Sequence, residues 1–201
     1  MPDKVTVFNI RKQLPVNKDY GEDTISELLS DFSCTKNPDI ELFLKKHSIE
    51  FTKKNQSVTY LVFSNDDASL LGYFTIAIKP LHINGTKFSN TLKRKLARVS
   101  QADLSDGIYT LSAYLIAQLG KNYAEGANNR ITGAQLLQAA IDTIKKIQYM
   151  AGGMVIFLET ENKEKLLHFY EKENGFIRFD TKKVNSASKG EHTLIQLLKI
   201  L

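Results

Sequence analysis

Hydrophobic and polar residues follow different periods along the second half of the chain, and these blocks predict a strand, a helix and another strand. The segment YLIAQLGKNY, residues 114–123, is an apolar run typical of a strand. After the polar loop AEGANNRITG, apolar residues recur every three or four positions, which predicts an amphipathic helix with the stripe Leu137, Ala140, Ile141, Ile144 and Ile147. The run MVIFLET, residues 154–160, predicts a buried strand. This order indicates a parallel crossover.

The start of the predicted helix carries a signal of its own. Thr132 and Gln135 fit a capping box in which Thr132 is the N-cap. The first N–H groups of a helix have no partner inside it and lie at the positive end of its macrodipole, so they form a site for a phosphate-bearing ligand. An ordinary capped strand–loop–helix connection explains the same residues, and on this stretch alone both interpretations stay open.

The first half of the chain predicts helices followed by a hairpin. We expect residues 1–20 to form a short edge strand or an irregular arm. Thr24 begins the capping box TISE, and Asn37 before Pro38 is typical of an N-cap with proline at the first helical position. The segments 57–64 and 70–79 are rich in β-branched and aromatic residues, which predicts an antiparallel hairpin.

The C-terminal part predicts a further helix and two closing strands. Asn162 is a suitable N-cap, and Gly175 suits the C′ position at the end of this helix. Strands are then expected around FIRF and HTLIQLLKIL. The whole order predicts an α/β (or α+β) fold, a mixed central sheet flanked by helices, in one domain over residues 1–201 with residues 1–20 as an N-terminal arm.

Composition narrows the function classes without choosing one. The formal net charge of +5 suits an anionic ligand. The single cysteine, Cys34, excludes an internal disulfide framework, and the N-terminus lacks the apolar core of a signal peptide, so we expect a cytoplasmic protein. No apolar run reaches the roughly 20 residues of a membrane span, and no Cys/His grouping has metal-ligand spacing, so we expect neither a membrane association nor a metal.

A basic cluster lies in the segment between the hairpin and the strand at residues 114–123. It consists of Lys87, Lys93, Arg94, Lys95 and Arg98. These charges form either an electropositive surface for a polyanion such as a nucleic acid or an ordinary solvated helix face. Apart from Phe88, no aromatic residue interleaves them, which favours the solvated face.

Two blocks of this sequence resemble the GNAT (GCN5-related) N-acetyltransferase superfamily. That family has a strand, a loop of pattern Gln/Arg-x-x-Gly-x-Gly/Ala and a helix, which together hold the pyrophosphate of acetyl-CoA. Here NNRITGAQLL occupies that place, with Gly133 at the last glycine, Ile131 at the middle glycine and Arg130 as an alternative cation. The second block, ENKEKLLHFYEKENGFIRF, matches the family's helix with a tyrosine before a Gly-Phe pair. Tyr170 is that tyrosine, with one residue inserted before Gly175.

The resemblance implies an acetyl-CoA-dependent N-acetyltransferase in which a primary amine attacks the thioester directly in a ternary complex. It implies a general acid at Tyr170, while Glu159 and Glu161 at the end of the preceding strand are candidate general bases or surface carboxylates. The strand end Gln118, Leu119 and Gly120 would pair with the pantetheine arm. The remaining cofactor-binding residues implied are Asn129, Arg130, Ile131, Thr132, Gly133, Ala134 and Asn162.

The N-terminal half is most similar to the toxin-type branch of this superfamily. The carrying segments are DFSCTKNPDIELFLKKHSIEFTKKNQSVTYLVF and LLGYFTIA. This similarity implies an aminoacyl-tRNA as the acceptor, with a small-molecule amine as the other possibility, and an antitoxin as a partner; homodimers are common for such folds. The alternative function is a catalytically inactive GNAT-like scaffold that binds a protein or a nucleic acid.

Overall fold

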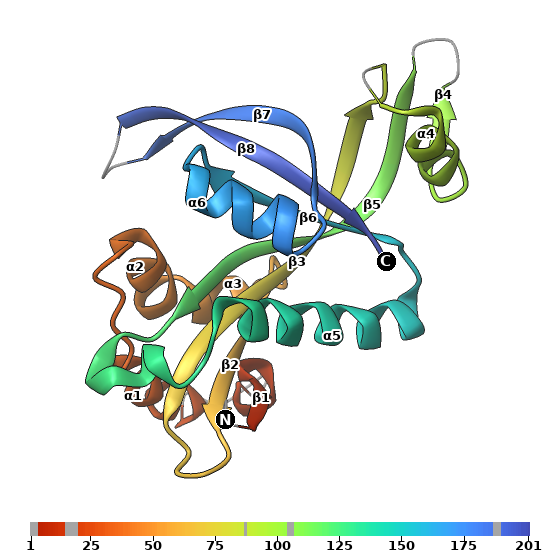
Figure 1. The fold of residues 1–201 in the computed structure, drawn as a ribbon. Helices are drawn as coiled ribbons and strands as arrows, with labels where there is room; N and C mark the ends of the chain where they lie inside the picture. The colour runs from red at the N-terminus through yellow and green to blue at the C-terminus, as the bar shows by residue number, and fades with distance from the viewer. Residues whose placement is uncertain (1–3, 15–19, 87, 104–106, 187–189) are drawn as a thin grey trace. The chain divides into compact units, whose positions relative to one another are not determined.

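The computed structural model describes residues 4–14, 20–86, 88–103, 107–186 and 190–201. These residues form two compact units, each built from two stretches of the chain. Unit 1 takes Met1–Ala77 and Ile116–Ile144, and unit 2 takes Ile78–Leu115 and Lys145–Leu201. The elements are drawn in Figure 1.

Strands of the described residues pair in the order β1-β2-β3-β5-β6-β8-β7, with β4 paired to β5. The strands are β1 Val5–Asn9, β2 Val58–Ser64, β3 Leu70–Asn84, β4 Gln101–Asp103, β5 Ile108–Lys121, β6 Val155–Glu161, β7 Ile177–Ser186 and β8 Gly190–Ile200. The α-helices are α1 Tyr20–Ser30, α2 Pro38–Lys46, α3 Ser48–Lys53, α4 Asn90–Ala97, α5 Gly133–Ala151 and α6 Glu164–Leu167. The 3-10 helices are η1 Ile10–Gln13 and η2 Ala124–Asn129, and η3 His168–Glu173 is a π-helix. This mixed sheet with helices is the α/β fold predicted from the sequence.

Unit 1 is built around the β1–β2–β3 ladder and the helices α1 to α3. The hairpin predicted from residues 57–79 is present, with β2 and β3 antiparallel. Its core draws apolar side chains from helices and strands alike, and its buried members are Ile10, Ile25, Leu29, Phe32, Cys34, Leu44, Leu61, Leu70 and Tyr73. Burial of the Cys34 thiol raises its pKa, so this cysteine is part of the packing.

Unit 2 joins the first part of β5 to β6, β8 and β7. The β6–β8 and β7–β8 pairs are antiparallel. Helix α4 lies beside β5 (Figure 1). Its Leu92 and Leu96 belong to the same buried core as Tyr109 and Leu111 of that strand. Because the other face of α4 carries its basic residues, the helix is amphipathic, and burial of its leucines accounts for its position.

Two predictions about helix starts met different outcomes. Helix α1 begins at Tyr20, so the predicted start at Thr24 is wrong; the acidic residues Glu22 and Asp23 lie in the first turn, where they complement the positive end of the helix macrodipole. Asn37 is the N-cap of α2 and Pro38 follows it, as predicted, but the Asn37 side chain makes no capping hydrogen bond. Strand β1 pairs with β2, so the first residues include the edge strand that was one of the two alternatives.

Candidate functional site

The start of helix α5 has the geometry that its capping box predicts. The Thr132 N–H donates to Gln135 Oε1 at 2.8 Å, and the Gln135 N–H donates to Thr132 Oγ1 at 3.1 Å. The Leu136 N–H donates to the Thr132 carbonyl at 3.1 Å. Among the hydrogen bonds of the described residues, none uses the N–H groups of Gly133 or Ala134. These two donors, at the positive end of a 19-residue helix, are suited to an anion.

The loop before α5 has Ile131 where the GNAT sequence pattern has its middle glycine. Its side chain is 2% exposed and belongs to the largest fully buried side chains of the protein. The described non-glycine residues with positive φ are Asn55, Ala68 and Glu125, so the backbone of Ile131 is in a conformation that any residue adopts. The isoleucine therefore anchors the loop in the core and leaves the following N–H groups at the surface.

Arg130 fastens the same loop to the turn between β2 and β3. Its Nη1 donates to Asp67 Oδ2 at 2.8 Å and to Ser69 Oγ at 3.0 Å, while its Nη2 donates to Asp67 Oδ1 at 3.0 Å and to Ser64 Oγ at 2.9 Å. The Arg130 guanidinium holds the pKa of Asp67 well below its usual range. Since all four Nη hydrogens are engaged, the arginine positions the loop. Its neighbour Asn129 is exposed and accepts from Asn128 Nδ2 at 2.9 Å.

The end of β5 and the start of α5 both lie close to Gly72 of β3. A Cβ at Gly72 would lie 2.7 Å from the Gly120 carbonyl oxygen and 3.2 Å from Leu136 Cδ2. Gly120 is enclosed in turn, because a Cβ there would lie 2.5 Å from Ile40 Cγ2. Gln118 and Leu119 before it are partly buried. Within unit 1, the predicted pantetheine-binding strand end and the predicted pyrophosphate-binding helix start are therefore close neighbours.

Asn122 secures the exit of β5, and the sequence analysis did not single it out. The residue is 3% exposed. Its Nδ2 donates to the Leu70 carbonyl at 2.8 Å and the Asp31 carbonyl at 3.1 Å, and its Oδ1 accepts from the N–H groups of Ser33 at 2.9 Å and Ala124 at 3.0 Å. A polar residue directly after an apolar strand is the sequence signal that marks it. By these bonds one side chain joins β3, β5, the segment after α1 and the loop toward α5.

In unit 2, Tyr170 lies in the π-helix η3. Its ring packs edge-on against Phe169 and Phe176, with centroids 4.9 and 5.8 Å away. Burial raises the pKa of Tyr170 to about 12. At neutral pH the hydroxyl is consequently protonated and can act as a hydrogen-bond donor.

The other predicted residues of unit 2 have different surroundings. Glu159 on β6 accepts from Lys182 Nζ at 3.1 Å through each carboxylate oxygen and from Gln196 Nε2 at 2.8 Å, so it links β6 to β7 and β8. Asn162 is exposed, and the N-cap of α6 is Lys163, so the predicted capping role of Asn162 is wrong by one position. The predicted end of this helical segment at Gly175 is confirmed by its φ of +69°.

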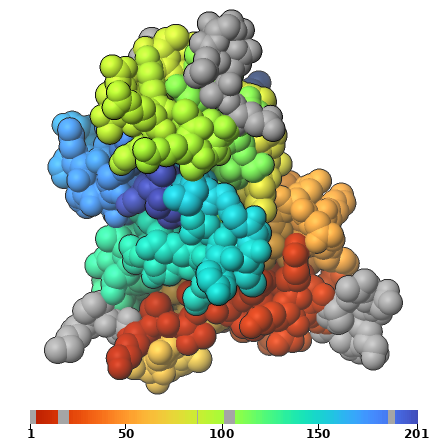
Figure 2. Space-filling view, turned by 90° about the vertical axis from the view of Figure 1, so that its right-hand side faces the viewer, coloured from red at the N-terminus to blue at the C-terminus, as the bar shows by residue number. Residues whose placement is uncertain are grey.

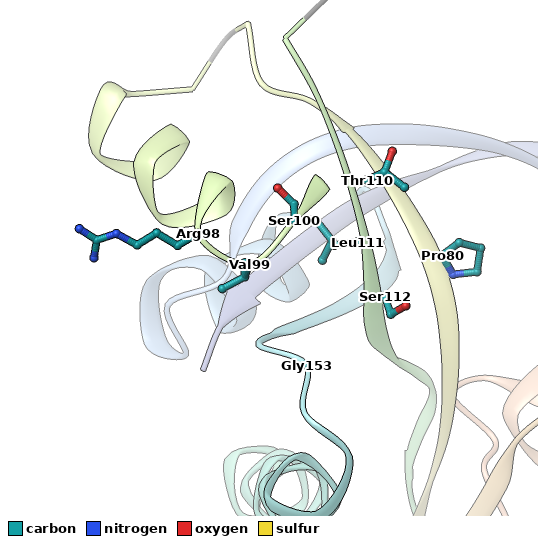
Figure 3. Close-up of a pocket in the computed structure, with 8 residues that line it drawn as sticks. All are labelled: Pro80, Arg98, Val99, Ser100, Thr110, Leu111, Ser112 and Gly153. Atoms are coloured by element: carbon teal, nitrogen blue, oxygen red, sulfur yellow. The ribbon is translucent and has the colours of Figure 1, made fainter. Parts of the chain in front are cut away.

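Unit 2 also contains an open pocket of about 590 Å³ (Figure 3). Its lining residues are Pro80, Arg98, Val99, Ser100, Thr110, Leu111, Ser112 and Gly153. Figure 3 shows that Arg98 extends away from the other labelled side chains, so the polar groups do not converge on one point. Of the basic residues of α4 and its end, Arg94, Lys95 and Arg98 are exposed and Lys93 is partly exposed, while Lys87 lies outside the described residues. The segment that carries them lies on the face shown in Figure 2.

Two classes of site find no support in the part of the chain that the structure describes. No group of three or more His, Cys, Asp or Glu side chains there has a geometry that could hold a metal ion. Over the same residues, no helix has the length and apolar character needed to cross a membrane.

Comparisons with known proteins give matches in structure. No protein-family model and no curated protein matches this sequence. The structure of AtaT complexed with acetyl-methionyl-tRNAfMet matches with a TM-score of 0.62 and 19% identity, over 96% of this chain and 94% of that one. A tyrosine-to-phenylalanine mutant of KacT matches with a TM-score of 0.63 and 17% identity, over 98% and 95%.

A third solved structure carries ligands. It is a tyrosine-to-phenylalanine mutant of the AtaT toxin bound to the C-terminus of the antitoxin AtaR and acetyl-CoA, with a TM-score of 0.56 and 16% identity over 98% of this chain and 94% of that one. These matches show that the chain has the fold of the AtaT and KacT toxins, which is the GNAT fold expected from the sequence.

Proposed function

We propose that this chain, with the fold of the AtaT and KacT toxins, is an N-acetyltransferase that moves the acetyl group of acetyl-CoA to a primary amine. The observation that carries the proposal is the capped start of α5, where the N–H groups of Gly133 and Ala134 follow a loop anchored by Ile131. A diphosphate is the kind of ligand that such a helix start binds. A neighbour of the same fold is a toxin with acetyl-CoA bound.

The cosubstrate is held by main-chain groups. The backbone of Gln118, Leu119 and Gly120 pairs with the pantetheine arm, and one N–H there faces the thioester oxygen as the tetrahedral intermediate forms. The segment from Asn129 to Ala134 takes the pyrophosphate, with Arg130 holding the loop in place through Asp67. Asn162 is proposed as a further cosubstrate-binding residue from its place near the helix-start asparagine of the GNAT sequence pattern.

The reaction is an acyl transfer without a covalent enzyme intermediate. The neutral amine nitrogen attacks the thioester carbon, a C–N bond forms, the C–S bond breaks, and the proton lost by the amine balances the proton gained by the thiolate. Glu159 is the candidate base for the amine, acting through water, and Tyr170 is the donor to the thiolate.

The pKa of Tyr170 determines whether its hydroxyl transfers a proton to the thiolate or only donates a hydrogen bond to it. A thiol of ordinary pKa near 8.5 is more acidic than a phenol of pKa about 12 by about 3.5, which corresponds to about 5 kcal/mol against full proton transfer. The Tyr170 hydroxyl therefore stabilises the developing thiolate by donating a hydrogen bond, and the proton that the thiolate gains is the one that the amine loses.

Calorimetry of acetyl-CoA binding tests the carrying observation. Gly133→Glu places a carboxylate at the helix start, where it opposes a bound diphosphate, so we expect binding to be lost. Ala151→Glu introduces the same charge at the exposed C-terminal residue of α5 and serves as the matched control. An unmodified chain that fails to bind acetyl-CoA at millimolar concentration would refute the proposal.

The catalytic role of Tyr170 has its own test. Because one hydrogen bond to a charge that develops in the transition state is worth roughly 100-fold or more, Tyr170→Phe should lower kcat by at least about 100-fold while the Kd for acetyl-CoA stays within about twofold. A stopped assay of thiol release measures kcat, and calorimetry measures the Kd. A variant that keeps its kcat rules out the hydroxyl as a donor.

For the acceptor we propose an aminoacyl-tRNA. The basic residues around α4 offer an electropositive surface, and one protein of the same fold is solved with acetyl-methionyl-tRNA. The prediction is salt-sensitive tRNA binding and growth arrest on expression, which Tyr170→Phe abolishes; harmless expression of the unmodified chain argues for a small amine instead. An antitoxin is the partner this function implies, and its co-purification can be detected by mass spectrometry.

A further inference from the structure

The helical turn that carries Tyr170 contains one residue more than an α-helix holds. Residues His168–Glu173 form a π-helix. At its end the Phe176 N–H donates to the Tyr170 carbonyl at 2.9 Å, six residues back, whereas the corresponding bond of an α-helix ending in glycine spans five. The residue inserted between Tyr170 and Gly175 is thus accommodated in the turn. Single π-turns are rare and recur at functional sites.

A side chain adds a hydrogen bond to this turn. The Asn174 Nδ2 donates to the Phe169 carbonyl at 2.7 Å. Lys199 Nζ donates in turn to the Asn174 carbonyl at 2.7 Å. Lys199 lies on β8 opposite Ile156 of β6, so the contact ties the turn to the sheet.

Lys199 also lies beside one of the two aromatic rings that pack against Tyr170. Lys199 Nζ lies 5.7 Å from the centroid of the Phe176 ring, which is 3% exposed and packs against Tyr170. The Tyr170 ring is therefore held on one side by Phe176 and along its backbone by the bond from Phe176 N–H. Displacement of Lys199 acts on Tyr170 through the Phe176 ring. Displacement of Asn174 acts on it through the carbonyl of the neighbouring Phe169.

We propose that Asn174 and Lys199 form a clamp that keeps the π-turn open and so sets the position of the Tyr170 hydroxyl for donation to the leaving thiolate. Both are positioning residues, since they act through Phe169, Phe176 and the backbone. The inference rests on the proposed acetyltransferase function for its catalytic consequence. In an α-helical turn with the extra residue removed, Tyr170 would turn by about 100° relative to Gly175.

The test uses Asn174→Ala, which removes the donor to Phe169, and Lys199→Met, which removes the ammonium but keeps the chain against Phe176. Matched controls are Asn185→Ala and Lys183→Met, the same changes at exposed positions of β7. Circular dichroism and thermal melting check that each variant is folded.

The first readout is independent of activity. In the full chain labelled with 3-fluorotyrosine, the fluorine signal of Tyr170 is assigned by its loss in Tyr170→Phe. Tyr149, which is 93% exposed, serves as the internal reference. We expect both clamp variants to shift the Tyr170 signal, while the controls leave it unchanged. An unchanged Tyr170 signal in both clamp variants overturns the proposal.

The second readout is kinetic. Misplacement of a proton donor by about 1 Å should lower kcat about 10- to 100-fold, with the KM for acetyl-CoA within about twofold. Clamp variants with the kcat of their controls overturn the catalytic consequence. If the unmodified chain shows no acetyl transfer, the proposed function fails, while the fluorine signals still decide whether Asn174 and Lys199 position Tyr170.

Discussion

Asn122 gives the sharpest prediction about stability. Its side chain makes four hydrogen bonds, as donor to the carbonyls of Asp31 and Leu70 and as acceptor from the N–H groups of Ser33 and Ala124. Asn122→Ala removes all four and leaves these backbone groups without that partner. Asn122→Asp keeps the two acceptor contacts but replaces the donor by a second carboxylate oxygen, which faces two carbonyl oxygens.

The expected magnitude follows from the number of bonds. At about 0.5–1.5 kcal/mol net for each hydrogen bond, Asn122→Ala should lower the free energy of unfolding by about 2–6 kcal/mol. For a chain of this size each kcal/mol corresponds to about 2–4 °C in Tm, so a loss near the middle of that range should lower the Tm by about 8–16 °C. The matched exposed change Asn185→Ala should leave the free energy of unfolding within about 0.5 kcal/mol of that of the unmodified chain.

The carboxyl introduced by Asn122→Asp should make the defect depend on pH. Burial against two carbonyl oxygens raises its pKa in the folded state above the value near 3.9 of the unfolded chain. The protonated form can again donate, so the loss of unfolding free energy should shrink as pH falls toward about 4 and grow as pH rises through the folded pKa. Urea titrations at pH 4.5 and 7.5 measure this. An equal deficit at both pH values, or a deficit below about 1 kcal/mol for Asn122→Ala, would refute the reasoning.

Two further predictions concern the predicted cosubstrate-binding half in unit 1. Gly120→Ala places a Cβ 2.5 Å from Ile40 Cγ2 and should lower the free energy of unfolding by about 1–3 kcal/mol through overpacking. In an Ile40→Ala background this loss should largely disappear. A double-mutant cycle by urea unfolding that shows no coupling would contradict the contact. Because Arg130 lowers the pKa of Asp67 below its ordinary 3.8, the stability that Asp67 contributes is present at neutral pH and is lost as pH falls below that value. The free energy of unfolding of the unmodified chain should therefore exceed that of Asp67→Asn at pH 7, and this difference should be smaller at pH 3. A difference that does not change with pH would show that the Arg130–Asp67 pair contributes nothing.

Local signals in the sequence predicted the elements that depend on local chemistry. The capping box at Thr132 forms both of its reciprocal hydrogen bonds, and Gly175 ends its helix with a positive φ. Such features are determined by a few adjacent residues, so they are visible without knowledge of the rest of the fold. The spacing after Tyr170 predicted one inserted residue relative to the family pattern, and the structure has a π-helix over His168–Glu173 at this place.

The features that were missed depend on contacts between distant residues. Asn122 is buried among groups up to 91 positions away, and nothing near it in the sequence shows that these carbonyls need donors. Arg130 was expected to act as a cation for the cosubstrate, and its bond to Asp67, 63 residues earlier, is likewise invisible in the sequence. The start of α1 was placed too late because the capping box at Thr24 matches a local pattern inside a longer helix.

The buried Ile131 has a consequence for how a ligand would meet this protein. A glycine-rich phosphate-binding loop has high conformational entropy before its ligand binds. The entropy lost when the ligand orders the loop lowers the affinity. Here the isoleucine side chain is part of the core of unit 1, so the loop is ordered when the unit folds. Binding and folding are then thermodynamically linked at one residue: trimming Ile131 would loosen the apo protein, and a ligand bound at the helix start would recover part of the stability that was lost.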